Sequence, residues 1–322
     1  MSLSLSDKDI YREWCINNDS ISVFMQPWFM DVASGEDNWE VILSKDKNGI
    51  AGALIYAIQR KFFFTYCRNP SLSYVNLWLS SDNQPAKPTY KRLMLQSKVL
   101  PDLLNQVPVC SMHMQFYPYT IENLFPIEKN KYTIEAVTHL KIDLQTDWRK
   151  DVKPSVWNNA KNAEKDLTIE TTTDLEKIYE LYAQTLKRFG KNPLFSFEKF
   201  TRLHTAIQLH KAGECYQAVD KNGHVHAVLY LIWDKNSVYY WIPASDEQFK
   251  GSNAMTFLLV KILTDATNKN FKQFYFKGST HESLLHFKAS FGAKTIIYYK
   301  VTRFSNIFFE FIYKTYKILR NR

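Results

Sequence analysis

The chain has 322 residues, of which 45% are hydrophobic and 15% aromatic, and it carries a net charge of +9 at pH 7. This composition excludes an intrinsically disordered chain, and the length suits two hydrophobic cores, because single cores stop growing at about 250–300 residues. The excess of basic residues suits an anionic partner such as a nucleotide cofactor, a nucleic acid or a membrane surface, but it serves solubility equally well.

The cysteines and the apolar runs indicate where such a protein works. Four cysteines, at positions 15, 67, 110 and 215, lie far apart and form no Cys-x-x-Cys pair, a pattern typical of reduced thiols without a structural zinc site. The N-terminus lacks the basic and apolar segments of a secretory signal. The longest apolar runs, such as residues 51–58, are far shorter than the ~20 residues of a spanning helix. We therefore expect a cytoplasmic protein without a transmembrane segment.

The first elements are predicted to be two helices and a hairpin. Residues 7–18 have helical spacing with Asp7 as a cap, and a short second helix begins at Pro27. Two strand-like runs, residues 39–43 and 50–56, flank Asp46-Lys47-Asn48-Gly49. An Asn-Gly pair between apolar runs predicts a hairpin with a type I′ turn, in which both central residues have positive φ.

The same four residues return later in the chain as Asp220-Lys221-Asn222-Gly223. A shift of 174 positions gives nine identities over residues 46–66, and these continue beyond the turn into the next strands. This offset is too long for a solenoid repeat and suits two copies of one α/β domain. The sequence therefore predicts a tandem duplication.

The two copies differ in their glycines. In the second copy, Gly251 precedes an apolar helix, whereas the first copy has no glycine between Gly52 and Gly190. A small-residue loop at a helix N-terminus favours a phosphate, because the first N–H groups of a helix are unpaired within it. We therefore assign the cofactor to the second copy and predict that the first is degenerate, with no phosphate loop.

The second copy has a specific order of elements, which starts after a strand at residues 132–143 and a polar helix at 148–166. Its predicted parts are two helices (174–189 and 196–207), three antiparallel strands (215–219, 226–233 and 238–242), a helix (253–268), a strand (273–277), a helix (280–290) and a last strand (295–301). The predicted divisions of the whole chain are an N-terminal domain at residues 1–145, a C-terminal domain at 146–303 and a helix at 304–322.

Five segments carry a resemblance to a known superfamily. They are Gln26-Pro27-Trp28, Asn159-Ala160-Lys161-Asn162-Ala163-Glu164, Gln248-x-x-Gly251-x-Asn253-Ala254, Phe276-Lys277-Gly278-Ser279 and His286-Phe287-Lys288-Ala289-Ser290-Phe291-Gly292. With the element order above, the chain resembles the GNAT acyltransferases, and in particular the double-GNAT proteins related to the FemAB peptidoglycan aminoacyltransferases and their acetyltransferase-like cousins. Over essentially the whole chain, the resemblance implies an α/β (α+β) fold of two tandem GNAT-like domains, each a mixed, largely antiparallel sheet flanked by helices.

The resemblance also implies a donor. The GNAT pyrophosphate loop is usually written Gln/Arg-x-x-Gly-x-Gly/Ala; Gln248 and Gly251 fit it, and Asn253 stands where Gly or Ala is expected. The implied co-substrate is acyl-CoA, above all acetyl-CoA, with no metal. The altered loop also fits FemAB-like members, which take the acyl group from aminoacyl-tRNA. The donor-binding residues implied are Gln248, Lys250, Gly251, Ser252, Asn253 and Ala254.

Acyl transfer to an amine needs a base, donors for the oxyanion and an acid for the leaving group. The GNAT-like geometry implies that the acyl group lies between the strands at 238–242 and 273–277. The candidate acids there are Tyr239, Tyr240 and Tyr275, the candidate anion donors are Lys277 and Ser279, and the candidate base is Glu282. Each tyrosine also suits a plain core position, and for the three of them we favour the core.

Two further patterns have competing interpretations. His224 and His226 share one face of a strand, as metal ligands do, but with no third ligand nearby we predict no metal site. Residues 304–322 place seven apolar side chains on one helical face and four basic ones away from it. Such a helix can lie on an anionic membrane, but a stripe at this spacing is more often core, so we expect it to pack on the first domain.

The function predicted from the sequence is transfer of an acyl group, in the first place acetyl, from acyl-CoA to an amine acceptor bound between the domains. The acceptor would be a small molecule or a cell-wall or surface sugar, with no DNA involved. A FemAB-like transferase that uses aminoacyl-tRNA and acts on a cell-wall precursor is the alternative, and a non-catalytic binding module is a third.

Overall fold

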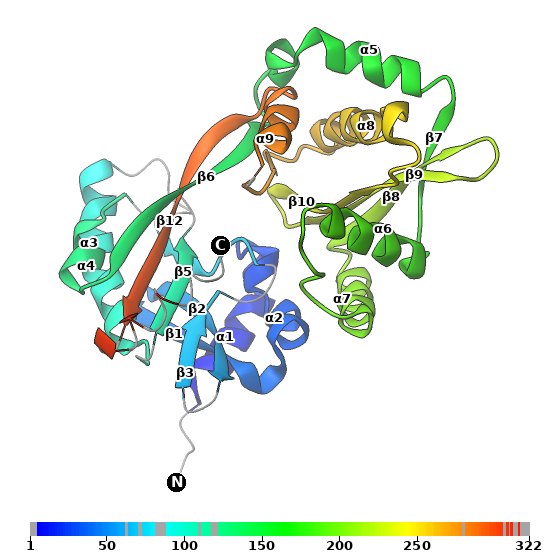
Figure 1. Ribbon diagram of the computed structural model, residues 1–322. Helices are drawn as coiled ribbons and strands as arrows, with labels where there is room; N and C mark the ends of the chain where they lie inside the picture. Colours follow the sequence, from blue (N-terminus) through cyan, green and yellow to red (C-terminus); the bar gives the residue numbers. More distant parts are fainter. Residues whose placement is uncertain are drawn as a thin grey trace. The chain divides into compact units, whose positions relative to one another are not determined.

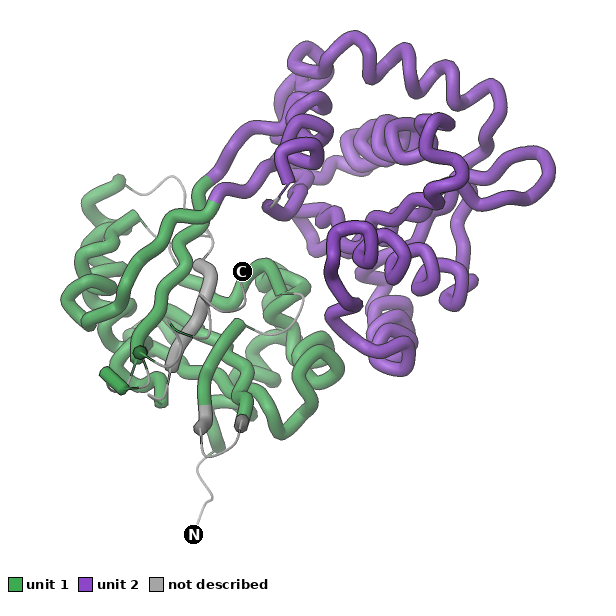
Figure 2. Tube along the Cα trace, in the orientation of Figure 1, with its two compact units in different colours: residues 1–137, 297–322 green, residues 138–296 purple. Residues whose placement is uncertain are grey.

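The computed structural model describes residues 5–61, 64–69, 73–80, 88–108, 111–116, 122–278, 281–304, 307–308, 310–311 and 315. The chain forms two compact units, shown in Figure 2: residues 1–137 together with 297–322, and residues 138–296. The sequence predicted domain boundaries after residues 145 and 303. In the structure, the chain passes from one unit to the other after residues 137 and 296.

The first unit begins with two helices and a hairpin. Helix α1 is capped by Ser6, whose hydroxyl accepts from the N–H of Asp9 while the Asp9 carboxylate accepts from the N–H of Ser6. This capping box, rather than Asp7, begins the helix. The elements of the unit, in chain order, are α1 (Asp7–Ile16), α2 (Pro27–Ser34), β1 (Trp39–Asp46), β2 (Gly49–Lys61), β3 (Phe64–Arg68), β4 (Leu77–Leu79), α3 (Thr89–Gln106), β5 (Ser111–Phe116) and α4 (Phe125–Lys129).

The second unit largely repeats this order after two additional elements. A polar helix and an edge strand come first, followed by two helices, an antiparallel hairpin with a third strand, a long helix, a strand and a short helix (Figure 1). The elements are α5 (Pro154–Ala163), β7 (Leu167–Thr171), α6 (Leu175–Arg188), α7 (Phe197–Leu209), β8 (Gly213–Asp220), β9 (Val225–Trp233), β10 (Ser237–Ser245), α8 (Ala254–Asn268), β11 (Gln273–Tyr275) and α9 (Glu282–Ala289). The mixed, largely antiparallel sheets flanked by helices confirm the predicted fold class.

Both hairpins form where the repeated tetrapeptides lie. In the first, β1 and β2 pair from Trp39↔Ala57 to Asp46↔Gly49, and in the second, the N–H of Gly223 donates to the carbonyl oxygen of Asp220 at 3.0 Å. Gly49 and Gly223 have positive φ, at 112° and 84°, but the asparagines before them do not. The predicted type I′ turn is therefore wrong, because each asparagine N–H instead meets the preceding aspartate carboxylate in an Asx turn.

Two long strands cross from one unit to the other. Strand β6 (Thr133–Asp143) begins in the first unit, and its last residues pair with β11 of the second, as in Asp143↔Gln273. Strand β12 (Lys294–Phe304) begins in the second unit, and its last residues pair with β5 of the first, from Tyr299↔Phe116 to Phe304↔Ser111. The predicted last strand of the second copy therefore pairs within the first unit, and the strand that ends the first copy completes the sheet of the second.

The core of the second unit lies between its sheet and the helices α5 and α8. Alternate residues of β9 point to opposite faces: Leu229 and Leu231 belong to the core under α8, while Tyr230 contacts Phe200 of α7. Figure 1 shows the same layers, with α5 and α8 on one side of the strands and α6 and α7 on the other. This arrangement holds the β10–α8 connection at one edge of a rigid core.

The helix predicted at residues 304–322 lies largely outside the described residues. The five described positions from 307 onward are helical, and Ile307, Phe308 and Phe311 are exposed by 85%, 67% and 67%. The predicted packing on the first domain is therefore not seen at these three side chains.

Candidate active site

Strands β10 and β11 of the second unit pair only briefly before they separate. They run parallel from Ser237↔Gln273 to Tyr239↔Tyr275, where β11 ends while β10 continues to Ser245. A bulge at Trp241 interrupts the pairing of β10 with β9 on its other side and turns β10 further. The separating backbones form a fork that opens beyond Tyr239 and Tyr275.

A buried lysine lies next to this fork. Lys288 of α9 is only 6% exposed, and its Nζ donates to the carbonyl oxygens of Lys277 at 2.8 Å and Gly278 at 3.3 Å, directly after β11. The same Nζ lies 5.9 Å from the ring centroid of Tyr240 on β10. Within the described part of the chain, no carboxylate pairs with this ammonium.

The environment of Lys288 is electropositive. Burial, and then the nearby charge of Lys277, lower the pKa of Lys288 from 10.5 to about 8. Burial, and then the charges of Lys277 and Lys288, lower the pKa of His139 on β6 to about 4. At neutral pH the imidazole is therefore uncharged while most of the Lys288 side chains keep their proton. A cation that is buried without a counter-ion favours negative charge beside it.

Gly278 is needed for this packing. A Cβ at this position would lie 2.8 Å from the carbonyl oxygen of Thr138 and 2.9 Å from the His139 ring. The first of these contacts would be with a backbone atom of Thr138, which cannot move aside as the end of a flexible side chain can. The glycine therefore lets the segment after β11 lie close against β6, so that its carbonyl groups reach Lys288.

The loop between β10 and α8 has an unusual helix start. Asn253 stands at the N-cap in a left-handed conformation, with φ 56° and ψ 20°, and its side chain accepts no hydrogen bond from the helix. Its amide nitrogen instead lies 3.4 Å from the carbonyl oxygen of Gly251. The first N–H groups of α8 are therefore left uncapped by the residue that usually caps them.

The loop between β10 and α8 leaves open space around Gly251. A Cβ on Gly251 would meet no protein atom within 4 Å, so packing within the protein does not explain the glycine. The Ser252 hydroxyl is buried and has no hydrogen-bond partner among the described residues. Lys250 is exposed beside it. An open backbone turn, a helix N-terminus and a lysine together fit the phosphate groups of CoA.

Comparison with known proteins identifies this part of the chain. Residues 151–288 match the family model described as acetyltransferase (GNAT) domain. They form a GNAT domain. The search of curated proteins found no match. The GNAT resemblance predicted from the sequence is thus confirmed.

Solved structures share the fold over most of the chain. FemX aligns with a TM-score of 0.61 at 11% identity, over 86% of this chain and 91% of FemX. The C-terminal domain of a putative lysylphosphatidylglycerol synthetase from Agrobacterium fabrum gives a TM-score of 0.58 at 14% identity, over 92% of both chains. A conserved protein of unknown function from Bacteroides thetaiotaomicron gives 0.53 at 10%, over 94% and 98%. At these identities the likeness shows the fold alone.

Some predicted catalytic residues of the GNAT domain lie at the fork, and others do not. Tyr240 faces Lys288, whereas Tyr275 is buried against the ring of Tyr239 at 5.4 Å, and burial raises the pKa of Tyr240 and Tyr275. Lys277, two residues after the end of β11, supplies a carbonyl group to Lys288. Glu282 is exposed in the first turn of α9, where its carboxylate lies 3.8 Å from His286. Ser279 lies outside the described residues.

The predicted donor-binding residues form one continuous loop at the start of α8. Gln248, Lys250 and Gly251 are exposed, Ser252 and Asn253 are half-buried, and Ala254 is buried in the first turn of the helix.

The histidine pair of the hairpin lies beside a carboxylate. His224 Nδ1 and His226 Nε2 lie 2.9 and 3.5 Å from the same carboxylate oxygen of Asp220. No group of three potential metal ligands occurs in the part of the chain that the structure describes.

Sequence reasoning missed Lys288 and His139 as functional candidates. Lys288 was quoted only within the segment that carries the family resemblance, because a lysine in a short helix is ordinarily solvated. The available signal was its place between Phe287 and Phe291, two aromatic residues that pack together at 5.1 Å. His139 belongs to a strand predicted for the first domain, so its place at the fork depended on the crossing of β6.

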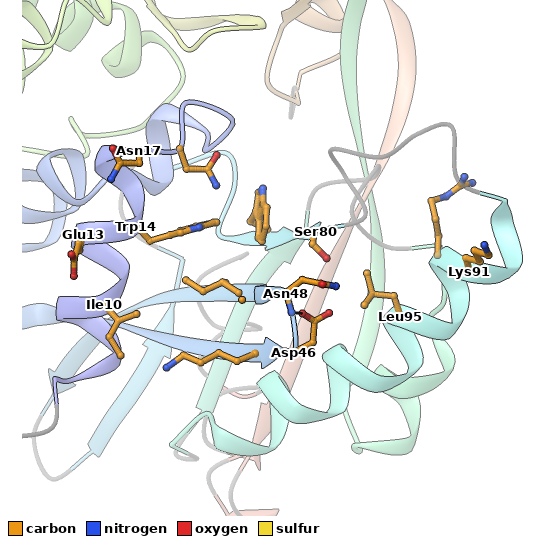
Figure 3. Close-up of a pocket in the computed structure, with 15 residues that line it drawn as sticks. Ile10, Glu13, Trp14, Asn17, Asp46, Asn48, Ser80, Lys91 and Leu95 are labelled. Atoms are coloured by element: carbon orange, nitrogen blue, oxygen red, sulfur yellow. Dashed lines mark hydrogen bonds between the residues drawn. The ribbon is translucent and has the colours of Figure 1, made fainter.

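A separate cavity of about 850 Å³ opens in the first unit (Figure 3). Its lining includes the Trp14 ring and Glu13 of α1, Asn48 of the hairpin, and Lys91 and Leu95 of α3. An aromatic face with carboxylate, amide and ammonium groups suits a polar small molecule. None of the residues predicted for the donor or the chemistry lines it.

Proposed function

We propose that the GNAT domain is an N-acyltransferase that moves an acyl group, in the first place acetyl, from acyl-CoA to an amine. The observation that carries this proposal is the buried ammonium of Lys288 at the fork of β10 and β11, which is held by two carbonyl groups and has no carboxylate partner among the described residues. The acceptor is a small-molecule amine or an amino group on a cell-wall or surface sugar. The proposed donor sets the reaction in the cytoplasm.

Lys288 would stabilise the negative charge that develops on the acyl oxygen. When an amine attacks a thioester carbonyl, the C=O electron pair moves to oxygen, and the tetrahedral oxyanion is stabilised by a fixed cation in a water-poor site. Collapse of the oxyanion breaks the C–S bond, and the leaving thiolate takes a proton. Tyr240, close to Lys288 and kept neutral by burial, is the proposed donor of that proton. It would then take up the N–H proton that the amine loses as the amide forms.

The residues of the β10–α8 loop would hold the CoA phosphates. The open backbone at Gly251, the uncapped start of α8 and the exposed Lys250 fit this group. CoA would supply the activated thioester; the protein would orient it and exclude water.

One observation favours a second candidate donor, aminoacyl-tRNA. Asn253 places an amide side chain where most GNAT loops have Gly or Ala, and this amide contacts the Gly251 carbonyl within the loop. The likeness to FemX over 86% of this chain and the net charge of +9 accord with this donor.

Among the residues that the structure describes, every helix is too short or too polar to cross a lipid bilayer.

Calorimetric titration of the full chain with acetyl-CoA and with CoA tests the donor. We expect micromolar binding that weakens at least tenfold in Gly251→Val, because the new side chain fills the open turn. A gel shift with total tRNA, run at low and high salt, tests the alternative, since backbone contacts with nucleic acid weaken as salt rises. If the chain binds neither millimolar CoA nor micromolar tRNA, the non-catalytic binding module would be the remaining candidate function.

A second experiment tests the proposed chemistry. With acetyl-CoA and a panel of amines, Lys288→Met should lower the rate of CoA release about a hundredfold or more, the usual effect of losing one oxyanion donor. The matched control is Lys261→Met, which removes an exposed lysine of α8 that pairs with Asp265 at 3.5 Å. Equal activity of the two variants would exclude the proposed role of Lys288.

A further inference from the structure

All the described residues that line the cavity of Figure 3 belong to the first unit. They come from α1, the turn between β1 and β2, the end of β4 and the start of α3. The volume of about 850 Å³ lies within the range of about 300–1,000 Å³ that is usual for small-molecule sites. A ligand in this cavity would therefore be separate from the acyl donor proposed for the GNAT domain.

Two tryptophans form the aromatic part of the lining. Trp14 of α1 and Trp78 of β4 meet edge to face, with ring centroids 4.8 Å apart and planes inclined by 69°. Trp78 is only 7% exposed, whereas Trp14 is half-buried and extends from α1 into the cavity (Figure 3). The buried ring holds the more exposed ring in place, so the cavity offers a fixed aromatic surface.

Several polar side chains of the lining have hydrogen-bonding groups to spare. Within the described part of the chain, the side chains of Glu13, Asn17 and Asn48 form no hydrogen bond or ion pair. The Asp46 carboxylate accepts the backbone N–H of Asn48 at 2.7 Å through one of its oxygens. An amide both donates and accepts, and each carboxylate oxygen accepts more than one hydrogen bond. These groups suit a ligand that carries several hydroxyl groups.

The charges at the cavity disfavour a highly charged ligand. Two of its basic groups already lie beside carboxylates, Arg92 beside Glu122 at 2.8 Å and Lys45 beside Asp7 at 3.4 Å. The remaining charges are of both signs: the ammonium of Lys91 and the carboxylates of Glu13 and Asp46. A nucleotide phosphate would lie near the carboxylates and a polyamine near the lysine, and like charges repel. A neutral ligand meets neither repulsion.

We propose that this cavity binds a neutral saccharide. The C–H bonds on one face of a sugar ring are weakly positive and pack on the negative face of an aromatic ring, here that of Trp14. The hydroxyl groups at the edge of the sugar would donate to the Glu13 carboxylate and exchange hydrogen bonds with the amides of Asn17 and Asn48. Such binding goes beyond the proposed function, because it requires neither acyl-CoA nor the fork of β10 and β11.

Saturation-transfer NMR of the full chain with three neutral trisaccharides tests this proposal. The probes are maltotriose, cellotriose and tri-N-acetylchitotriose, and we expect at least one of them to bind with a dissociation constant of about 1 mM or below. Because the probes are uncharged, raising the salt concentration should leave the affinity unchanged. The proposal is overturned if none of the three binds, or if ADP binds in the cavity more tightly than all of them.

Two variants and a control locate the site. Trp14→Ala should weaken binding at least tenfold, because it removes the aromatic surface. Asn48→Ala should weaken it about threefold to tenfold, the effect of one lost hydrogen bond. The matched control is Trp157→Ala, which removes a half-buried tryptophan of α5 that stacks on Trp148 at 6.1 Å in the second unit, and it should bind normally. Normal binding by Trp14→Ala, or an equal loss in the control, would exclude the cavity as the site.

Two further measurements separate saccharide binding from folding and from the proposed function. If thermal unfolding shows that Trp14→Ala does not fold, Asn48→Ala decides, because its side chain is exposed and surface substitutions change stability little. Normal saccharide binding by Asn48→Ala would then overturn the proposal. Acetyl-CoA titration of both variants should match the unchanged chain, because the substitutions lie outside the GNAT domain. Failure of the unchanged chain to bind acetyl-CoA would count against the proposed function alone.

Discussion

The imidazole ring of His226 lies flat on the phenyl ring of Phe249, with the ring centroids 3.9 Å apart and the planes inclined by 5°. Phe249 belongs to the proposed donor loop, and His226 to strand β9 after the hairpin turn. The N–H of Asp246 also donates to the carbonyl oxygen of His226 at 2.9 Å. The hairpin therefore fixes the start of the loop, and Asp220 in turn forms a hydrogen bond with His224 at 2.9 Å and lies 3.5 Å from His226 Nε2.

Phe249→Ala should loosen the donor loop without unfolding the domain. A stacked aromatic pair contributes about 0.5–1.5 kcal/mol beyond the area that it buries, so the free energy of unfolding should fall by about 1–2 kcal/mol. Calorimetry should show fivefold to tenfold weaker binding of acetyl-CoA, because the loop must then be ordered by the ligand. Phe249→Tyr keeps the ring and should bind normally. Normal binding by Phe249→Ala would show that the stack does not position the loop.

Lys288→Met should separate stability from activity. The folded protein lowers the pKa of Lys288 from 10.5 to about 8, so burying this ammonium costs up to about 3 kcal/mol at pH 7. Urea unfolding at pH 7 should therefore find the variant as stable as the unchanged chain or more stable, while acyl transfer is lost. A large loss of stability would indicate a structural role for the lysine.

The pH dependence of activity should report on the same ammonium. Because the Lys288 pKa is lowered to about 8, the rate should fall as the pH rises above this value and the ammonium loses its charge. Lys288→Arg, which stays charged at higher pH, should move this fall upward if it retains activity. A rate that stays level up to pH 10 would contradict an electrostatic role.

Acidification should destabilise the chain through His139. Its pKa is lowered from 6.5 to about 4 in the folded protein, so the unfolded chain binds the proton more readily between these values. Above pH 6.5 the free energy of unfolding has its full value, because the imidazole is neutral in both states. As the pH falls toward 4, the free energy of unfolding decreases by up to about 3 kcal/mol. Urea midpoints measured from pH 7.5 to 4.5 should show this loss, and His139→Gln should reduce it. Equal pH slopes for the two proteins would refute the assignment.

The left-handed conformation of Asn253 leads to a last prediction. Asparagine and glycine adopt a φ of 56° more readily than alanine. Asn253→Ala should therefore lower the free energy of unfolding by about 1 kcal/mol, whereas Asn253→Gly should change it by less than about 0.5 kcal/mol. Thermal unfolding of both variants checks the order. If acyl-CoA is the donor, Asn253→Gly should bind it at least as tightly as the unchanged chain does.

The sequence predicted most of the fold because its signals were local. The tetrapeptides at Asp46 and Asp220 marked both hairpins, and helical periodicity marked α6, α7 and α8 within a few residues. In both hairpins the turn type was wrong, because the aspartate side chain competes for the asparagine N–H. In contrast, the partners of β6 and β12 were not predictable, since a strand's own pattern shows that it pairs but not with which distant strand.

The candidate site was predicted less completely. The loop from Gln248 to Ala254 lies before α8 as predicted, because a glycine before an apolar helix is a local pattern, and its role in binding the donor stays a prediction. Lys288, the residue on which the proposed function rests, was not singled out from the sequence, because a pattern of residue types does not show which side chains are buried. Glu282 was predicted as a base and is exposed, and its role stays a prediction. Burial of Lys288 depends on Gly278 and on β6, which are distant from it in sequence.

The crossing of β6 and β12 has a consequence for the order of folding during synthesis. Strand β5 emerges from the ribosome before the second unit, but its partner, Tyr299–Phe304, is made only after it. The first unit must wait with one sheet edge open until the second has been translated. The unit that is begun first is therefore completed last, and a nascent chain that stalls before residue 299 would leave this edge open to pairing with another chain.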